Sequence, residues 1–251
     1  MAERTKAGDL KSLGGFAARP WVRIPPPPPK IFGGKSMKLT IYLITDDRYF
    51  KDRDLIQVIE QALLGGVTAV QYRFKKKTTK EMYEELVKLR ELTRKYNADL
   101  VVNDRLDLAL AVEADGIHIG KEDLPPEVVR EIVGDKMYIG YTANSIEEVK
   151  KAQELPIDYI GFGSIYHTTT KDNYKYVGLE ALQEAVKISK KPIVCIGGIM
   201  SYRVPEVVKA GCRNIAAASG ILGFADVRKA AESFKRAYQE TLRMLMLMGK
   251  V

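Results

Sequence analysis

The chain of 251 residues is 46% hydrophobic and 29% charged, proportions typical of a folded protein with one sizeable core. No apolar run reaches the roughly 20 residues of a membrane span, and the apolar residues near the start are too scattered for a signal peptide, so we expect a cytoplasmic protein without membrane contact. The net charge is +8, but residues 1–36 contribute +5 and leave only +3 for residues 37–251. This distribution argues against a nucleic-acid partner.

Residues 1–36 differ in composition from the rest of the chain. They hold the only Trp and six of the eleven prolines, five of them consecutive, and show neither a helical nor a strand period. We predict a disordered, basic, Pro-rich extension that is not necessarily native, followed by one domain over residues 37–251. A functional basic arm is the alternative. Cys195 and Cys212 are the only cysteines, and we expect both to be reduced thiols.

From Leu39 onward, short Val/Ile/Tyr-rich runs alternate with stretches of helical period, the pattern of a parallel sheet with crossover helices. Strands are predicted, in chain order, at 39–45, 69–75, 100–104, 116–120, 137–143, 159–166, 192–199 and 214–221. Helices are predicted between and after them at 54–66, 79–97, 105–114, 125–134, 145–155, 178–189, 204–211 and 225–245.

Eight such units favour a single (β/α)8 TIM barrel of the α/β class. An open doubly wound sheet is the alternative, but LITDDRYFKD after the first strand lacks its Gly-rich fingerprint. The active site of a barrel lies at the carboxyl ends of its strands. The unusual polar and small residues of this sequence lie at or just after the carboxyl ends of its predicted strands, which agrees with a barrel: Gln71, Arg73, Lys75, Asn103, Asp104, Asp123, Thr142, Thr168, Thr169, Thr170, Lys171, Gly198, Ala218 and Ser219.

Two groups of these residues suit anionic ligands. Gln71, Arg73 and Lys75 are spaced two apart on a strand, so they share one face, and the barrel interior accepts such a row better than the helix layer does. A solvated strand end is the alternative for this row. The run HTTTK supplies hydroxyl donors and Lys171, while GGI and ASG supply backbone amides. Phosphate sites in barrels often follow strands seven and eight.

Two carboxylates follow neighbouring strands. Asp104 and Asp123 are placed to share one hard cation such as Mg²⁺, which takes few protein ligands and keeps positions for phosphate oxygens. The alternative is that Asp104 pairs with Arg105 and that Asp123 caps the helix predicted at 125–134. Two anion sites with a divalent cation between them fit one substrate with a diphosphate and another with a monophosphate.

The motifs VQYRFK, VVNDRLDLALAVEADGIHIGKEDLP, YIGFGSIYHTTTK, CIGGI and AAASGI, in this order, resemble the thiamine phosphate synthase family. The resemblance implies that hydroxymethylpyrimidine diphosphate and hydroxyethylthiazole phosphate are joined to thiamine phosphate, with release of pyrophosphate. It assigns the magnesium to Asp104 and Asp123 and the catalytic roles to Arg73, Lys75, Lys171 and Thr142. It assigns the pyrimidine diphosphate to Gln71, Tyr72, Arg73, Phe74, Lys75, Asn103, Thr142 and Lys171, and the thiazole phosphate to Thr168, Thr169, Thr170, Gly198, Ala218 and Ser219.

The sequence departs from the family pattern at four positions. Thr142 stands where the family usually has Ser, Lys121 where it has Gln, Asn144 where it has His, and His167 where it has Pro. Thiazole tautomerases of the same superfamily are the rival interpretation, and they need a His near Asn144, so the sequence favours the synthase. A nucleic-acid-binding protein acting through residues 1–36 is a third alternative. A homodimer is left open.

Overall fold

The computed structural model of the chain describes residues 31–32, 35–168 and 175–250. The extension predicted over residues 1–36 therefore lies mostly outside the described residues. At its end, β1 (Ile31–Phe32) pairs antiparallel with β2 (Lys35–Ser36).

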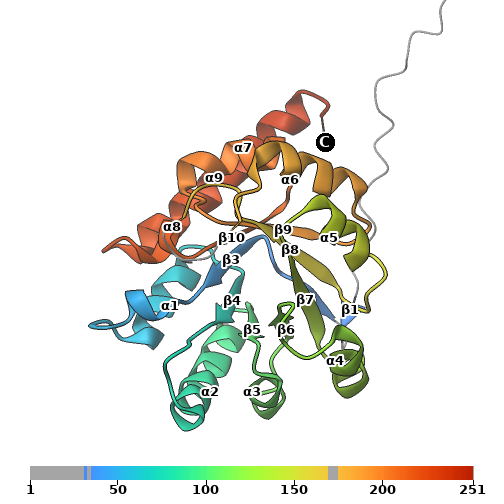
Figure 1. Cartoon of the computed structure of the whole chain (residues 1–251). Coiled ribbons are helices and arrows are strands. Elements are labelled where there is room, and N and C mark those ends of the chain that lie inside the picture. Colours follow the sequence, from blue (N-terminus) through green and yellow to red (C-terminus); the bar gives the residue numbers. More distant parts are fainter. Residues whose placement is uncertain (1–30, 33–34, 169–174, 251) are drawn as a thin grey trace, which may run out of the picture.

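Eight parallel strands close into a barrel in the order β10-β3-β4-β5-β6-β7-β8-β9, with helices around it (Figure 1). The predicted fold class is confirmed, and each predicted strand is present. The strands are β3 (Ile41–Ile44), β4 (Ala69–Tyr72), β5 (Asp99–Asn103), β6 (Gly116–Ile119), β7 (Tyr138–Ala143), β8 (Tyr159–Gly163), β9 (Ile193–Ile196) and β10 (Asn214–Ala217).

Each predicted helix is also present, and local signals mark several of the ends. Thr78 and Glu81 form a reciprocal capping box, Pro126 is the first residue of its helix, and Gly134 is a C-cap with φ +54°. The helices are α1 (Leu55–Leu64), α2 (Thr79–Lys95), α3 (Leu106–Ala111), α4 (Pro126–Val133), α5 (Ile146–Ala152), α6 (Gly178–Ile188), α7 (Val204–Lys209) and α9 (Val227–Leu247).

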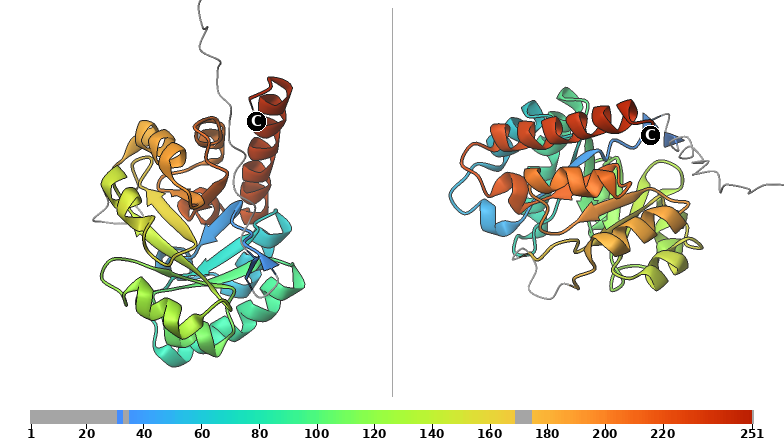
Figure 2. Two further views of the ribbon diagram at one scale, coloured as in Figure 1. Left: turned by 90° about the vertical axis from the view of Figure 1, so that its right-hand side faces the viewer. Right: turned by 90° about the horizontal axis from the view of Figure 1, so that it is seen from above.

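The last helix, α9, is the longest described and carries the chain past the end of the barrel, as the left view of Figure 2 shows. It packs on α1 and α7, so it links the first and last units of the ring. None of the helices in the described part of the chain combines the length and apolar character needed to cross a membrane.

Two apolar cores lie on the two faces of the sheet. The larger one fills the space between barrel and helices, and a smaller one, which includes Tyr42, Ala69 and Tyr159, fills the barrel interior. Side chains along β4 alternate between them: Ala69 lies in the inner core, and Val70 and Tyr72 lie in the outer one. Gln71 donates to the inner Tyr42, so the row Gln71–Arg73 faces the interior.

Short elements that the sequence did not reveal follow three of the strands. They are η1 (Asp47–Tyr49), η2 (Ser201–Arg203) and α8 (Ser219–Leu222). The strands predicted at 192–199 and 214–221 are therefore too long. Gly197 and Gly198 have φ of +105° and +60°, which takes the chain out of the sheet, and Ser219 begins α8 rather than continuing β10. These turns put loop backbone at the barrel mouth, the end where the strands finish.

Candidate active site

A cavity of about 190 Å³ opens at the barrel mouth and is lined by residues from all around the barrel. Predicted site residues from six different strand ends meet there although they are up to 148 positions apart (219 − 71). Asp46 and Lys175, which the sequence did not single out, line it as well, and so do His118 and Asn144. The predicted residues that line it are Gln71, Arg73, Asn103, Thr142, Thr168, Gly198, Ala218 and Ser219.

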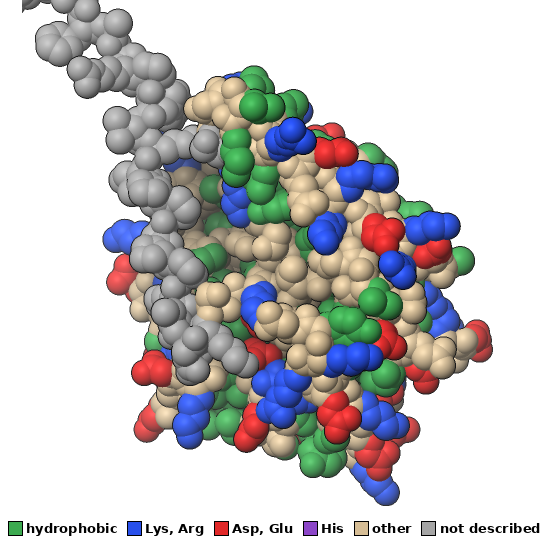
Figure 3. Space-filling model, turned by 180° about the vertical axis from the view of Figure 1, so that it is seen from behind, with side chains coloured by type: hydrophobic (Ala, Val, Ile, Leu, Met, Phe, Trp, Pro, Cys, Tyr) green, Lys and Arg blue, Asp and Glu red, His purple; other side chains and the backbone are tan. Residues whose placement is uncertain are grey.

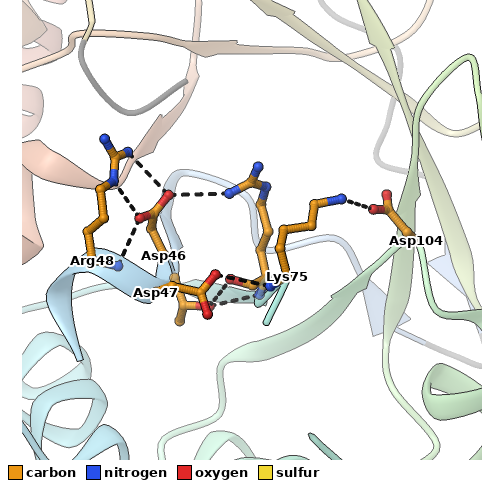
Figure 4. A network of polar contacts seen from close by, with 7 residues as sticks. Asp46, Asp47, Arg48, Lys75 and Asp104 are labelled. Atoms are coloured by element: carbon orange, nitrogen blue, oxygen red, sulfur yellow. Dashed lines mark hydrogen bonds and ion pairs between the residues drawn. The ribbon is translucent and has the colours of Figure 1, made fainter. Parts of the chain in front are cut away.

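The loop after β3 contacts Arg73 through Thr45 and Asp46. Thr45 Oγ1 accepts from the Arg73 backbone N–H at 2.7 Å, and Asp46 Oδ2 lies 3.3 Å from Arg73 Nη1. Asp46 also binds Arg48 Nε at 2.8 Å, so it lies between two guanidinium groups (Figure 4). Burial of the Asp46 carboxyl opposes ionisation, but the hydrogen bonds and charge of Arg48, with the charge of Arg73, keep its pKa below the usual value.

Lys75, Asp104 and Asp123 form a charged cluster beside the cavity. Lys75 Nζ reaches across to Asp104 Oδ2 at 2.6 Å, as Figure 4 shows, and the Lys75 backbone N–H donates to Asp47 at 3.0 Å. Asp123 Oδ2 accepts from the Gly120 backbone N–H at 2.6 Å. Burial, and then the neighbouring Asp104, raise the pKa of the Asp123 carboxyl. The two carboxylates therefore lie close enough to repel each other.

Neither alternative for these carboxylates is found. Arg105 pairs with Asp107, and the N-cap residue of α4 is Pro125, without a side-chain cap. Asp104 has φ +62°, a left-handed conformation that Asp adopts more readily than most residues and that turns the chain at the end of β5. Among the described residues, no three His, Cys, Asp or Glu side chains gather as a metal cluster.

The opposite side of the mouth is built from backbone. A Cβ at Gly198 would overlap the backbone oxygen of His167, and its φ of +60° also favours glycine. Arg203 fixes this turn, because its Nη1 donates to the Gly198 oxygen at 2.6 Å and its guanidinium lies 4.3 Å from the centre of the Tyr166 ring. Ala218 and Ser219 line the cavity beside this turn.

Other predicted residues lie elsewhere. Tyr72 and Phe74 point to the helix layer, where Tyr72 donates to Glu85 at 2.5 Å and its ring centre lies 4.8 Å from that of Phe74. The structure does not bring them to the cavity, because they alternate with Gln71 and Arg73 along the strand. Thr169, Thr170 and Lys171 lie outside the described residues.

The departures from the family pattern lie at the rim. Lys121 Nζ binds Glu148 at 2.5 Å, and Glu148 accepts from the Asn144 backbone N–H at 2.6 Å, so two of the departures share one carboxylate. His167 is exposed and stacks on Tyr176 with ring centres 4.7 Å apart. Lys121 and His167 do not line the cavity, whereas Asn144 does.

Comparisons with known proteins show which proteins this chain is similar to. A family model described as thiamine monophosphate synthase matches residues 41–221. The chain is 86% identical to thiamine-phosphate synthase 1 of Aquifex aeolicus over 86% of this chain and all of the relative, and 53% identical to the thiamine-phosphate synthase of Hydrogenobaculum sp. over 84% and 98%. A solved thiamine phosphate pyrophosphorylase from Pyrococcus furiosus superposes with a TM-score of 0.76 at 42% identity, over 82% of this chain and 98% of that one.

Proposed function

The chain belongs to the thiamine monophosphate synthase family, and we propose that its barrel mouth joins hydroxymethylpyrimidine diphosphate to hydroxyethylthiazole phosphate. The products are thiamine phosphate and pyrophosphate, so the enzyme is a transferase of thiamine biosynthesis. One observation carries this assignment: Arg73, which follows β4, and the backbone turn at Gly198 line a single cavity. Such a cavity suits a diphosphate on one side and a monophosphate on the other.

The diphosphate side uses Gln71, Arg73, Lys75, Asn103 and Thr142, with Lys171 added on the basis of the resemblance alone. Arg73 and Lys75 supply positive charge where the leaving group gathers negative charge. When the C–O bond to the diphosphate breaks, its electron pair stays on pyrophosphate, and the thiazole nitrogen then donates its lone pair to the pyrimidine methylene carbon. No protein nucleophile is needed. The task of the side chains is to neutralise and orient.

Asp104 and Asp123 would hold the metal ion, which we propose to be Mg²⁺. The fit rests on charge: two close carboxylates, one with a raised pKa, are stabilised by a cation, and Lys75 already supplies one to Asp104. A bound Mg²⁺ would neutralise diphosphate oxygens. Asp104 follows β5 and Asp123 follows β6. Lys75 follows the neighbouring strand β4 and contacts Asp104, so the ion and Lys75 would act on the same leaving group.

The thiazole phosphate side uses Thr168, Gly198, Ala218 and Ser219, with Thr169 and Thr170 proposed from the resemblance. Gly198 lets the backbone approach an anion closely, and small side chains at Ala218 and Ser219 keep that path open. Both ligands are small phosphorylated molecules, and we place the reaction in the cytoplasm, in agreement with the free thiols of Cys195 and Cys212.

The test is direct. Purified protein is mixed with Mg²⁺ and both phosphorylated substrates, and thiamine phosphate and pyrophosphate are measured together. Equal amounts of the two products are expected. A thiazole tautomerase would instead interconvert thiazole phosphate isomers without the pyrimidine substrate. Isomer exchange without thiamine phosphate would refute the proposal.

A further inference from the structure

A network of polar side chains, three of them buried and two half-buried, crosses the barrel interior and lines the cavity. Gln71 Nε2 lies 2.8 Å from Tyr42 Oη, Tyr42 Oη lies 3.1 Å from Tyr159 Oη, Tyr159 Oη lies 2.9 Å from His118 Nδ1, and His118 Nε2 lies 2.9 Å from Thr142 Oγ1. We call these five residues the interior network. It joins two proposed diphosphate contacts, Gln71 and Thr142, that come from strands on different sides of the barrel.

The barrel is shaped around this network. Tyr42, Tyr159 and Gln71 are each at most 2% exposed, so each polar atom must find its partner inside the protein. Two glycines, Gly140 and Gly161, leave space for the side chains of Tyr159 and His118. A Cβ at Gly140 would overlap the Tyr159 ring and lie 2.5 Å from His118 Nδ1, and a Cβ at Gly161 would lie 3.0 Å from His118 Cε1.

The hydrogen bonds of the network can point in one consistent direction. Burial raises the pKa of both Tyr42 and Tyr159, so each phenol keeps its proton and has one hydrogen to give. In this direction, the Gln71 amide donates to Tyr42, Tyr42 donates to Tyr159, and Tyr159 donates to His118 Nδ1. His118 then carries its hydrogen on Nε2 and donates to Thr142 Oγ1.

This direction decides what Thr142 offers to a ligand. A hydroxyl that already accepts a hydrogen bond from His118 keeps its own hydrogen free for an anion. If the direction were reversed, the Thr142 hydrogen would be spent on His118, and only lone pairs would face the diphosphate, which would repel it. The direction is therefore as important as the presence of the hydroxyl.

We propose that the interior network holds His118 as the Nε2–H tautomer and thereby makes Thr142 a hydrogen-bond donor to the departing diphosphate. His118, Tyr159 and Tyr42 are positioning residues, since they act through Thr142 and Gln71. The proposal rests on the proposed function, in which Thr142 contacts the diphosphate. It gives these three residues a role beyond packing.

The tautomer is measured first, in the full-length protein without substrate. The chain has only two histidines, His118 and His167, so ¹⁵N-labelled imidazoles give two sets of signals, and His167→Gln identifies those of His118. The Nε2–H form is expected for His118 in wild type. The Nδ1–H form or an imidazolium at neutral pH would overturn the proposal, whatever the activity.

Kinetics test the consequence. Tyr159→Phe should lower kcat/KM for the pyrimidine diphosphate about 10-fold, the lower end for loss of a supporting hydrogen bond, and leave binding of thiazole phosphate unchanged. Tyr138→Phe is the matched control, because it removes another buried phenol of the inner core, bonded instead to Asp99 at 3.2 Å. Its kcat/KM should stay within about twofold. An equal loss in both variants would reduce the network to packing.

A double-substitution cycle completes the test. In a Thr142→Ala background, Tyr159→Phe should cost less than about twofold, because the hydroxyl it orients is gone, whereas in Thr142→Ser the 10-fold cost should return. Full multiplicative losses with Thr142→Ala would overturn the proposal. Should Tyr159→Phe not fold, Tyr42→Phe serves in the same cycle. Wild type that makes no thiamine phosphate but holds the Nε2–H tautomer would refute the proposed function and leave the direction of the network standing.

Discussion

Arg73 and Lys75, which follow β4, are each held by a carboxylate from a neighbouring strand end. Asp46 after β3 binds Arg73, and Asp104 after β5 binds Lys75 (Figure 4). Such pairing keeps a long side chain in one place before a ligand arrives, which reduces the entropy lost on binding. The two carboxylates also offset part of the positive charge of Arg73 and Lys75.

The first residue-scale prediction concerns Asp46. Its pKa lies below the ordinary value because Arg48 and Arg73 stabilise the charged form. The stabilisation is therefore complete above the unfolded pKa near 4 and is lost as the pH falls through the lower folded value. Asp46→Asn should lower the free energy of unfolding by about 1–2 kcal/mol at pH 7, and the difference from wild type should shrink below about pH 4.

Denaturant unfolding from pH 7 to pH 3 measures this, with the exposed Asp52→Asn as control. A difference that stays constant over this range would show that the Asp46 charge does not stabilise the fold.

The second prediction concerns the metal ligands. Asp104→Asn and Asp123→Asn should each reduce turnover by at least about 100-fold at saturating Mg²⁺, because each removes a charged ligand oxygen. Neither should lower the melting temperature of the metal-free protein by much, because each substitution relieves the repulsion between the carboxylates. Turnover and thermal unfolding are measured on the same samples. Undiminished activity of wild type and both variants in excess chelator would disprove the metal assignment.

The third prediction separates the two sides of the mouth. Arg73→Ala should lose roughly 2–4 kcal/mol of transition-state stabilisation, the scale for a charge-stabilising donor in a closed site. Binding of thiazole phosphate should change little, because its phosphate is assigned to the side of Gly198. Lys171→Ala is expected to behave in the same way.

Arg48→Ala is the matched control for Arg73→Ala, since Arg48 binds the same Asp46 but does not line the cavity. Steady-state kinetics and equilibrium binding of thiazole phosphate check the prediction. Wild-type rates in Arg73→Ala would show that Arg73 does not stabilise the leaving group.

Residue spacing predicted part of this site and missed another part. The two-residue spacing of Gln71 and Arg73 predicts that both lie on the inner face of the barrel. The same spacing puts Tyr72 and Phe74 on the helix side, although the family motif assigns all four residues to the diphosphate site. Asp46 is not predicted, because LITDDRYFKD carries no recognisable site motif. Its position at a strand end was the available signal.

At the scale of the elements, periodicity was sufficient for each strand and helix of the barrel, whereas their ends depended on backbone conformation. β9 and β10 end earlier than their apolar runs suggest. β9 ends because Gly197 and Gly198 adopt positive φ, and β10 ends because the chain turns into α8; the local sequence allows both turns but does not determine them. The same holds for interior glycines, which read as weak strand residues and become space for Tyr159 and His118.

An element-scale prediction follows for β7. Gly140→Ala puts a methyl group into the Tyr159 ring, inside a closed sheet that cannot move aside, so it should lower the free energy of unfolding by about 3 kcal/mol and reduce turnover. Gly134→Ala is the control: its Cβ meets nothing within 4 Å, so only its positive φ costs stability, and turnover should be unchanged. Denaturant unfolding and initial rates check both. A Gly140→Ala variant as stable and active as wild type would contradict the packing of the interior network.

At the scale of the whole molecule, the closed barrel brings residues from both ends of the chain to one mouth, because β10 pairs with β3. Ser219 and Asp46 line the same cavity for this reason alone, so no local pattern could show their proximity. Of the net charge of +8, residues 1–36 contribute +5 and the barrel, residues 37–251, contributes only +3. On the face that Figure 3 shows, acidic and basic side chains are interspersed, which suits small phosphorylated ligands at one mouth better than a polyanion along a surface.

The whole-molecule prediction concerns residues 1–36. Contacts with the barrel are already present at Lys38, whose backbone N–H donates to Asp99 at 2.8 Å and whose Nζ donates to the Asn97 oxygen at 2.7 Å, and every strand of the barrel lies after it. A chain that starts at Met37 keeps these bonds and the entire mouth. It should therefore unfold at the same temperature as the full chain, within about 2 °C, and turn over at the same rate.

Removal of seven Lys or Arg and two Asp or Glu also takes +5 from the net charge, so any affinity of the full chain for DNA or RNA at low salt should disappear in the shorter chain while its synthase activity remains. Melting, initial rates and nucleic-acid binding are compared at equal salt. A large loss of activity on truncation would show instead that residues 1–36 close over the barrel mouth, because residues 37–251 are the same in both chains.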